Sequence, residues 1–227
     1  MNEEMNETPE KRKNTYVSLN EWLVKMRIAF GNAKLPAILS VLQMVGYTEE
    51  MLDKLLDELA ALEGLCDVQK METSEQIAET QRFNDKRSDV NETFLMHRNL
   101  CRVLFRKNVQ AQIALSLNAP TKVAYANWLR LVEGFYSQLP LSDSLKTEVA
   151  KVGISEAVIS AAVANVAEMK MLKDSQKKET SEAQASTEKR DQAFDALYEK
   201  YTELIGYAKA LLKGDQALEA LGIVVKR

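Results

Sequence analysis

Apolar residues recur every seven positions along two long stretches of this chain. In the stretch 52–104, the series that start at Leu52 and Leu55 are apolar at both ends and polar in the middle. In the stretch 159–211, the series from Ile159 and Ala162 follow the same plan. A heptad repeat is typical of a helix that supercoils around a partner helix. Because both ends of each stretch keep one phase, we predict two continuous helices that lie antiparallel in a coiled-coil-like pair.

The polar middle of each stretch leaves one alternative open. If the chain reversed near Thr73 and near Thr180, each stretch would form a helical hairpin and the protein a compact bundle. A turn gives no physical reason for the apolar phase to continue beyond it. The continuous helix is therefore the preferred interpretation.

Shorter helices are predicted before each long one. Ser18 and Glu21 have the spacing of a capping box, which predicts a helix over 19–31. Pro36 suits the first turn of a second helix, and Gly46 suits its left-handed end. The second half of the chain predicts corresponding helices at 121–138 and 141–152, and a short last helix at 216–221.

An internal duplication explains why the two halves share this plan. At a shift of 107, ten of the sixteen residues in 65–80 are identical to those in 172–187. At a shift of 106, Trp22 corresponds to Trp128. We therefore predict an all-α protein made of a disordered tail (1–17), a first helical repeat (18–117), a linker (118–123) and a second helical repeat (124–227), with small bundles of short helices at the ends of the long pair.

The second repeat carries a resemblance as well. Its segments VGISE (152–156), ETSEAQAST (179–187) and ALEALGIVVKR (217–227) are similar to those of a group of bacterial helical proteins. The resemblance implies the same duplicated helical layout. No activity is assigned to that group, so it implies no function.

Bulk properties narrow the class of protein. A net charge of −3 provides no strong field for nucleic acid or acidic membranes, and we expect neither as a partner. The amino-terminal residues have no apolar segment of the kind found in secretory signals, and the two cysteines form no disulfide framework. We therefore expect a cytoplasmic protein with reduced thiols.

Catalytic and metal signatures are weak. His97 is the single histidine and lies at a core position of the heptad, so we expect a buried, hydrogen-bonded side chain. A di-iron bundle needs two histidines, and the cysteines lack zinc-ligand spacing. We predict no enzymatic activity, no catalytic residues, no metal and no cofactor.

Two other features are candidates for binding. Arg98, Arg102 and Arg106 recur every four residues and are expected on a solvated helix face, opposite a core row of Met96, Leu100 and Leu104. This basic face is a possible interaction surface and the basis of an alternative function, association with nucleic acid. Trp22 and Trp128 are expected to anchor the small bundles, and a small ligand bound beside one of them is a second alternative.

The most specific feature is a set of polar residues at core positions of the long helices, retained in both repeats: Gln69, Thr73, Thr80, Gln176, Thr180 and Thr187. Polar core residues fix helix register at a cost in stability. We interpret them first as register determinants and second as a surface for a partner. The leading functional hypothesis is a non-enzymatic interaction or scaffold protein that presents an elongated helical surface to a protein partner or to a second copy.

Overall fold

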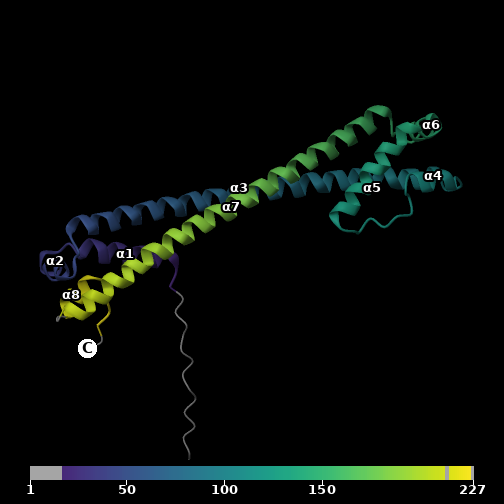
Figure 1. The fold of residues 1–227 in the computed structure, drawn as a ribbon. Helices are drawn as coiled ribbons and strands as arrows, with labels where there is room; N and C mark the ends of the chain where they lie inside the picture. The colour runs from purple at the N-terminus through teal and green to yellow at the C-terminus, as the bar shows by residue number, and fades with distance from the viewer. Residues whose placement is uncertain (1–16, 213–214, 226–227) are drawn as a thin grey trace, which may run out of the picture. The chain divides into compact units, whose positions relative to one another are not determined.

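The computed structural model describes residues 17–212 and 215–225, and in these residues all regular structure is helical. The expected disordered tail, except for residue 17, lies outside the described residues. The elements, in chain order, are α1 (Leu19–Asn32), α2 (Pro36–Leu42), η1 (Gln43–Val45), α3 (Glu49–Leu104), α4 (Val109–Ala114), α5 (Tyr125–Gln138), η2 (Leu139–Leu141), α6 (Asp143–Ala150), α7 (Glu156–Leu211) and α8 (Asp215–Ala220) (Figure 1). The all-α prediction is confirmed.

The two long helices are continuous. Each of α3 and α7 has 56 residues, and neither breaks at Thr73 or Thr180, so the hairpin alternative is wrong. The helices pack against each other and run antiparallel: Lys86 of α3 contacts Asn165 of α7, whereas Thr80, earlier in α3, contacts Gln176, later in α7. The preserved heptad phase predicted this correctly.

The chain forms two compact units, and each takes part of both repeats. Unit 1 comprises Met1–Gln69 and Ser186–Arg227, and unit 2 comprises Lys70–Ala185. Unit 1 contains α1, α2 and α8, unit 2 contains α4, α5 and α6, and each unit also holds one end of α3 and one end of α7. Neither repeat by itself corresponds to a compact unit.

Unit 1 has an apolar core between α1, α2 and the long-helix ends. Phe30, Leu52 and Leu204 are fully buried there, and Leu221 after α8 joins them. Trp22 is half-buried, with its ring edge-on to Tyr198 at a centroid distance of 4.9 Å. The aromatic residues of α1 therefore anchor this helix to α7, as expected.

Unit 2 has a corresponding core between α5, α6 and the opposite ends of the long helices. Phe94, Phe135 and Leu139 are completely or almost completely buried, and Trp128 is 3% exposed. The rings of Phe94 and Phe135 pack edge to face at 5.4 Å. Trp128 is thus a buried anchor, as predicted.

Capping residues set the ends of the helices. Ser18 and Glu21 form both hydrogen bonds of the capping box at α1. Thr48 and Ser155 accept from backbone amides in the first turns of α3 and α7. Gly46 ends η1 with φ of 92°, a left-handed conformation that favours glycine.

Several helix boundaries differ from the prediction. The long helix α3 ends at Leu104, and the chain then turns into the separate helix α4, which was not predicted. Helix α5 begins at Tyr125 instead of 121, and α6 covers Asp143–Ala150 instead of 141–152. Leu115, which follows α4, is fully buried and corresponds to Leu221 at the shift of 106.

Among the described residues, no single helix is long and apolar enough to cross a membrane. One bent pair, Leu19–Asn32 with Pro36–Val45 at 88°, meets the criterion of length and composition.

Candidate functional site

The polar core positions of unit 2 connect the two long helices. The side-chain amide of Gln176 in α7 donates to the hydroxyl of Thr80 in α3 at 3.2 Å. The hydroxyl of Thr180 donates to the backbone carbonyl of Gln176, within α7. All three side chains are half-buried, so these hydrogen bonds are partly shielded from water. The bond between Gln176 and Thr80 links one specific pair of positions across the helices.

The other polar core residues are placed similarly. Gln69, Thr73 and Thr187 are half-buried, and each has an interaction partner. Gln69 and Thr187 are the counterparts of Gln176 and Thr80 at the shift of 107, and both belong to unit 1. The positions are therefore partly buried in both units. Their role in register remains a prediction.

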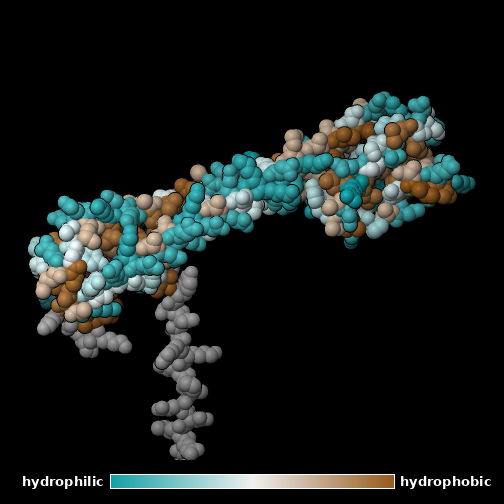
Figure 2. All heavy atoms as spheres, viewed as in Figure 1, coloured by the Kyte–Doolittle hydropathy of each residue, from teal (hydrophilic) through white to brown (hydrophobic). Residues whose placement is uncertain are grey.

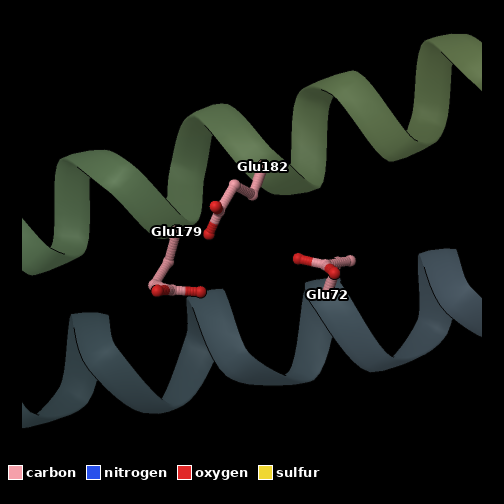
Figure 3. A group of neighbouring side chains, drawn as sticks. All are labelled: Glu72, Glu179 and Glu182. Carbon is pink, nitrogen blue, oxygen red and sulfur yellow. The ribbon is translucent and has the colours of Figure 1, made fainter.

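Three carboxylates gather beside these residues in unit 2. Glu72 of α3 and Glu179 and Glu182 of α7 place one oxygen each within 4.8 Å of the others (Figure 3). Glu72 and Glu179 are equivalent positions of the two repeats, so the duplication brought together like charges.

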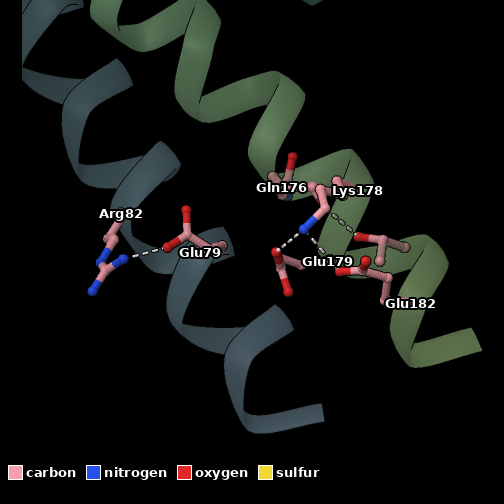
Figure 4. A network of polar contacts seen from close by, with 7 residues as sticks. Glu79, Arg82, Gln176, Lys178, Glu179 and Glu182 are labelled. Carbon is pink, nitrogen blue, oxygen red and sulfur yellow. Dashed lines mark hydrogen bonds and ion pairs between the residues drawn. The ribbon is translucent and has the colours of Figure 1, made fainter. Parts of the chain in front are cut away.

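A lysine neutralises part of this charge. The ammonium of Lys178 lies 3.3 Å from a carboxylate oxygen of Glu182 and 3.6 Å from one of Glu179 (Figure 4). Farther along α3, Glu79 pairs with Arg82 in the same view. Oxygen ligands of this kind suit hard cations such as Mg²⁺ or Ca²⁺. Because Lys178 already supplies a cation to two of the three carboxylates, we assign no metal here.

His97 lies in the core of unit 2, as predicted. Its side chain is 3% exposed, and its Nδ1 atom lies 2.9 Å from the hydroxyl of Tyr136. Burial lowers the pKa of His97, and burial is also the main cause that raises the pKa of Tyr136. The imidazole is therefore neutral at physiological pH and has a hydrogen-bond partner. This is the environment of a structural histidine.

Both cysteines are thiols, not halves of a disulfide, and both are buried. Burial raises the pKa of Cys101 to about 11, so at neutral pH its thiol is almost entirely protonated. A protonated, buried thiol is a weak nucleophile. Both cysteines and the single histidine are thus held in the core.

The expected basic face is only partly exposed. Arg98 is 2% exposed, and its guanidinium donates to the backbone carbonyls of Ser116 and Ala119. Arg102 is exposed, and its Nε donates to the carbonyl of Leu117 at 2.7 Å. Arg106 is exposed. The prediction of one solvated row is therefore wrong at Arg98, because the loop after α4 covers this side of α3.

The opposite side of α3 is exposed instead. Met96, Leu100 and Val103 are 54%, 36% and 74% exposed, so the expected core role of Met96 and Leu100 is also wrong. The three side chains lie four and three residues apart and therefore share one face of the helix. Their counterparts in α7 are Glu203, Tyr207 and Ala210, so the other repeat lacks this apolar pattern. We call these three residues the α3 apolar face.

A groove lies between α7 and the shorter helices of unit 2. It has a volume of about 620 Å³, and Ile159, Val163 and Ala167 contribute its apolar side on α7. Two ion pairs lie in its lining, Lys146 with Glu156 at 3.2 Å and Lys170 with Glu133 at 2.8 Å. Both lysines are engaged, which leaves no free cation to select an anionic ligand there.

Compared with family models, with curated proteins and with solved structures, the chain has no match.

Proposed function

We propose that this chain is a non-enzymatic interaction protein, and that it associates through the α3 apolar face. The exposure of Met96, Leu100 and Val103 on one side of a helix is the observation that carries the proposal. Contiguous apolar residues at the surface of a helix mark sites of association. Figure 2 shows further hydrophobic surface near the α4 end of unit 2, where Val109 and Ile113 are 64% and 73% exposed.

The occupant that we propose is a second copy of the same face. Glu92 precedes the face in α3, Lys107 lies in the turn that follows α3, and both are exposed. In an antiparallel pair related by a twofold axis near Leu100, Glu92 of one copy approaches the turn that carries Lys107 of the other. Twofold interfaces are self-complementary in this way. The charges at the two ends of the face therefore favour self-association with antiparallel polarity.

Other functions have less support. Nucleic-acid binding through the arginine row would need several free guanidinium groups to contact phosphates. Arg98 is buried and Arg102 already donates to a carbonyl, which leaves Arg106. For an enzymatic role, the single histidine and Cys101 offer no accessible group, because both are buried.

The oligomeric state tests the proposal. We expect the mass measured by sedimentation equilibrium to rise towards that of a dimer as the concentration increases from micromolar to millimolar. Val103→Glu should keep the protein monomeric, because two carboxylates would be buried without partners. Ile77→Glu is the matched control, since Ile77 is also exposed in α3, at 62%, but lies outside the α3 apolar face.

A charge exchange tests the antiparallel polarity. Glu92→Lys should weaken association, and the double variant Glu92→Lys with Lys107→Glu should restore it, because the opposite charges face each other again. A wild-type protein that stays monomeric at every concentration would refute the proposal. So would equal effects of Val103→Glu and Ile77→Glu.

A further inference from the structure

A second cavity in unit 2 has a different chemical character from the groove. It lies between α3 and the segment that leads into α5, with a volume of about 670 Å³. This volume is in the range of small-molecule sites. Its polar side chains include Arg87, Ser88, Asn91, Thr121 and Lys122, and no carboxylate belongs to its lining. The chain as a whole has slightly more acidic than basic residues, 33 against 30. The lining of this cavity differs, because its charged side chains are all positive.

Aromatic rings hold Arg87 in place. Its guanidinium carbon lies 5.4 Å from the ring centroid of Trp128 and 5.5 Å from that of Tyr125. Cation–π contacts of this kind fix a guanidinium and leave its N–H groups available at the edge. Within the described part of the chain, Arg87 has neither a hydrogen bond nor an ion pair. Its charge is thus positioned but not neutralised.

The neighbouring polar groups add hydrogen-bond donors. The indole N–H of Trp128 donates to the Oδ1 atom of Asn91 at 2.9 Å. Asn91 also carries the Nδ2 amide, which is a hydrogen-bond donor. Ser88 and Thr121 add hydroxyls, and Lys122 adds an exposed ammonium. The cavity therefore offers several donors and two positive charges.

We propose that this cavity binds a small phosphate monoester. A phosphate group carries about two negative charges and three acceptor oxygens, which match a guanidinium, an ammonium and several neutral donors. The polar remainder of the lining suits a hydroxyl-bearing molecule better than an apolar one. A carboxylate shares the charge but has fewer acceptor oxygens, and it should bind more weakly. This site is separate from the α3 apolar face, and the inference does not depend on self-association.

Tryptophan fluorescence provides a direct test. The chain has two tryptophans, and in a Trp22→Phe background Trp128 is the single reporter, in contact with Arg87. We expect a saturable change in its emission with millimolar inorganic phosphate and a larger affinity for glycerol phosphate. Acetate at matched ionic strength should bind more weakly than phosphate or not at all. Glycerol and sodium chloride should give no saturable change in the emission of Trp128. Calorimetry on the wild-type chain should give the same order of affinities.

Variants decide whether the site is the one described. Arg87→Gln should weaken phosphate binding about tenfold or more, because a charge-assisted hydrogen bond is lost. Lys122→Gln removes an exposed charge without changing the packing of Trp128 and should also weaken binding. Arg82→Gln is the matched control on the same helix, where the arginine pairs with Glu79. It should bind phosphate like the parent protein.

Three results would overturn the inference. One is the absence of saturable phosphate binding in the wild-type protein. Another is equal binding by the Arg87→Gln, Lys122→Gln and Arg82→Gln variants. The third is binding of single-stranded nucleic acid that phosphate and glycerol phosphate do not compete with, since that would indicate a macromolecular partner.

Discussion

The ion pair between Glu133 of α5 and Lys170 of α7 has the reverse polarity of its counterpart in the other unit. Glu133 corresponds to Arg27 at the shift of 106, and Lys170 corresponds to Glu63 at the shift of 107. Arg27 and Glu63 also form an ion pair, between α1 and α3. Both residues of the pair have exchanged charge between the repeats while the contact persists. The attraction, and not the identity of either residue, is what the two units share.

A charge exchange at this pair tests that interpretation. Glu133→Lys places two lysines together and should lower the melting temperature of the protein slightly, since the pair is exposed to solvent. The double variant Glu133→Lys with Lys170→Glu restores the attraction with the polarity of unit 1. We expect its melting temperature, followed by circular dichroism at low salt, to return to that of the wild type. Equal melting temperatures of the single and double variants would contradict the interpretation.

The buried pair of His97 and Tyr136 predicts a pH dependence of stability. Burial lowers the pKa of His97 below its ordinary value of 6.5, so below pH 6.5 the unfolded chain binds more protons than the folded one. The contribution of His97 to stability is therefore complete above pH 6.5 and declines as the pH falls towards the folded pKa. The decline is at most about 1.4 kcal/mol per pH unit for one group.

The other repeat suggests the matched variant for this test. The counterparts of His97 and Tyr136 are Leu204 and Phe30, both buried in unit 1. In the double variant His97→Leu with Tyr136→Phe, we expect the free energy of unfolding to lose this part of its pH dependence between pH 6.5 and lower values. Tyr136→Phe alone leaves Nδ1 of His97 without its partner and should cost about 1–3 kcal/mol. Urea unfolding of the three proteins at several pH values provides the comparison, and parallel pH profiles would contradict the prediction.

The hydrogen bond between Gln176 and Thr80 should show coupling in a double-mutant cycle. Thr80→Val removes the acceptor and Gln176→Leu removes the donor, and each leaves a half-buried polar group with a lost partner. The double variant removes both groups and should be more stable than the sum of the single changes predicts, by about 1 kcal/mol. Chemical unfolding of the four proteins measures this coupling. Strictly additive changes would mean that the two side chains do not interact.

The continuous helices could be predicted because their signal is long and repeats in both copies. Leu52, Leu59, Phe94 and Cys101, all from one heptad series, are buried as expected. The capping box at Ser18 and the left-handed Gly46 were also predictable, since each depends on residues close in sequence. Local chemistry and periodicity thus account for most of the architecture.

The surfaces could not be predicted in the same way. The exposure of Met96 and the burial of Arg98 depend on which side of α3 the loop after α4 covers, and this is a tertiary contact. The cluster of Glu72, Glu179 and Glu182 depends on the register of the antiparallel helices. Arg87 belongs to the core heptad series that starts at Leu52, and its contact with Trp128 comes from the other repeat. In each case the decisive neighbour is distant in sequence.

Arg98 should be the most sensitive of the three arginines that the sequence groups together. Its guanidinium donates to the carbonyls of Ser116 and Ala119, and Ser116 has φ of 49°, in the left-handed region that residues other than glycine rarely adopt. Arg98→Met removes both bonds and should cost about 3 kcal/mol in the free energy of unfolding, because two carbonyls lose a charged donor. We also expect faster hydrogen exchange of the amides in residues 115–119.

Arg106→Met is the control for this change, since Arg106 is exposed in the turn that follows α3 and should contribute less than about 0.5 kcal/mol. Arg98→Lys tests charge and geometry separately. The lysine ammonium keeps the positive charge, but it lacks the planar guanidinium that donates to two carbonyls at once. If geometry matters, Arg98→Lys should destabilise the protein nearly as much as Arg98→Met. Similar stabilities of the Arg98→Met and Arg106→Met proteins would show that the buried guanidinium does not hold the loop, and that the loop stays in place through the buried Leu115 and Leu117 alone.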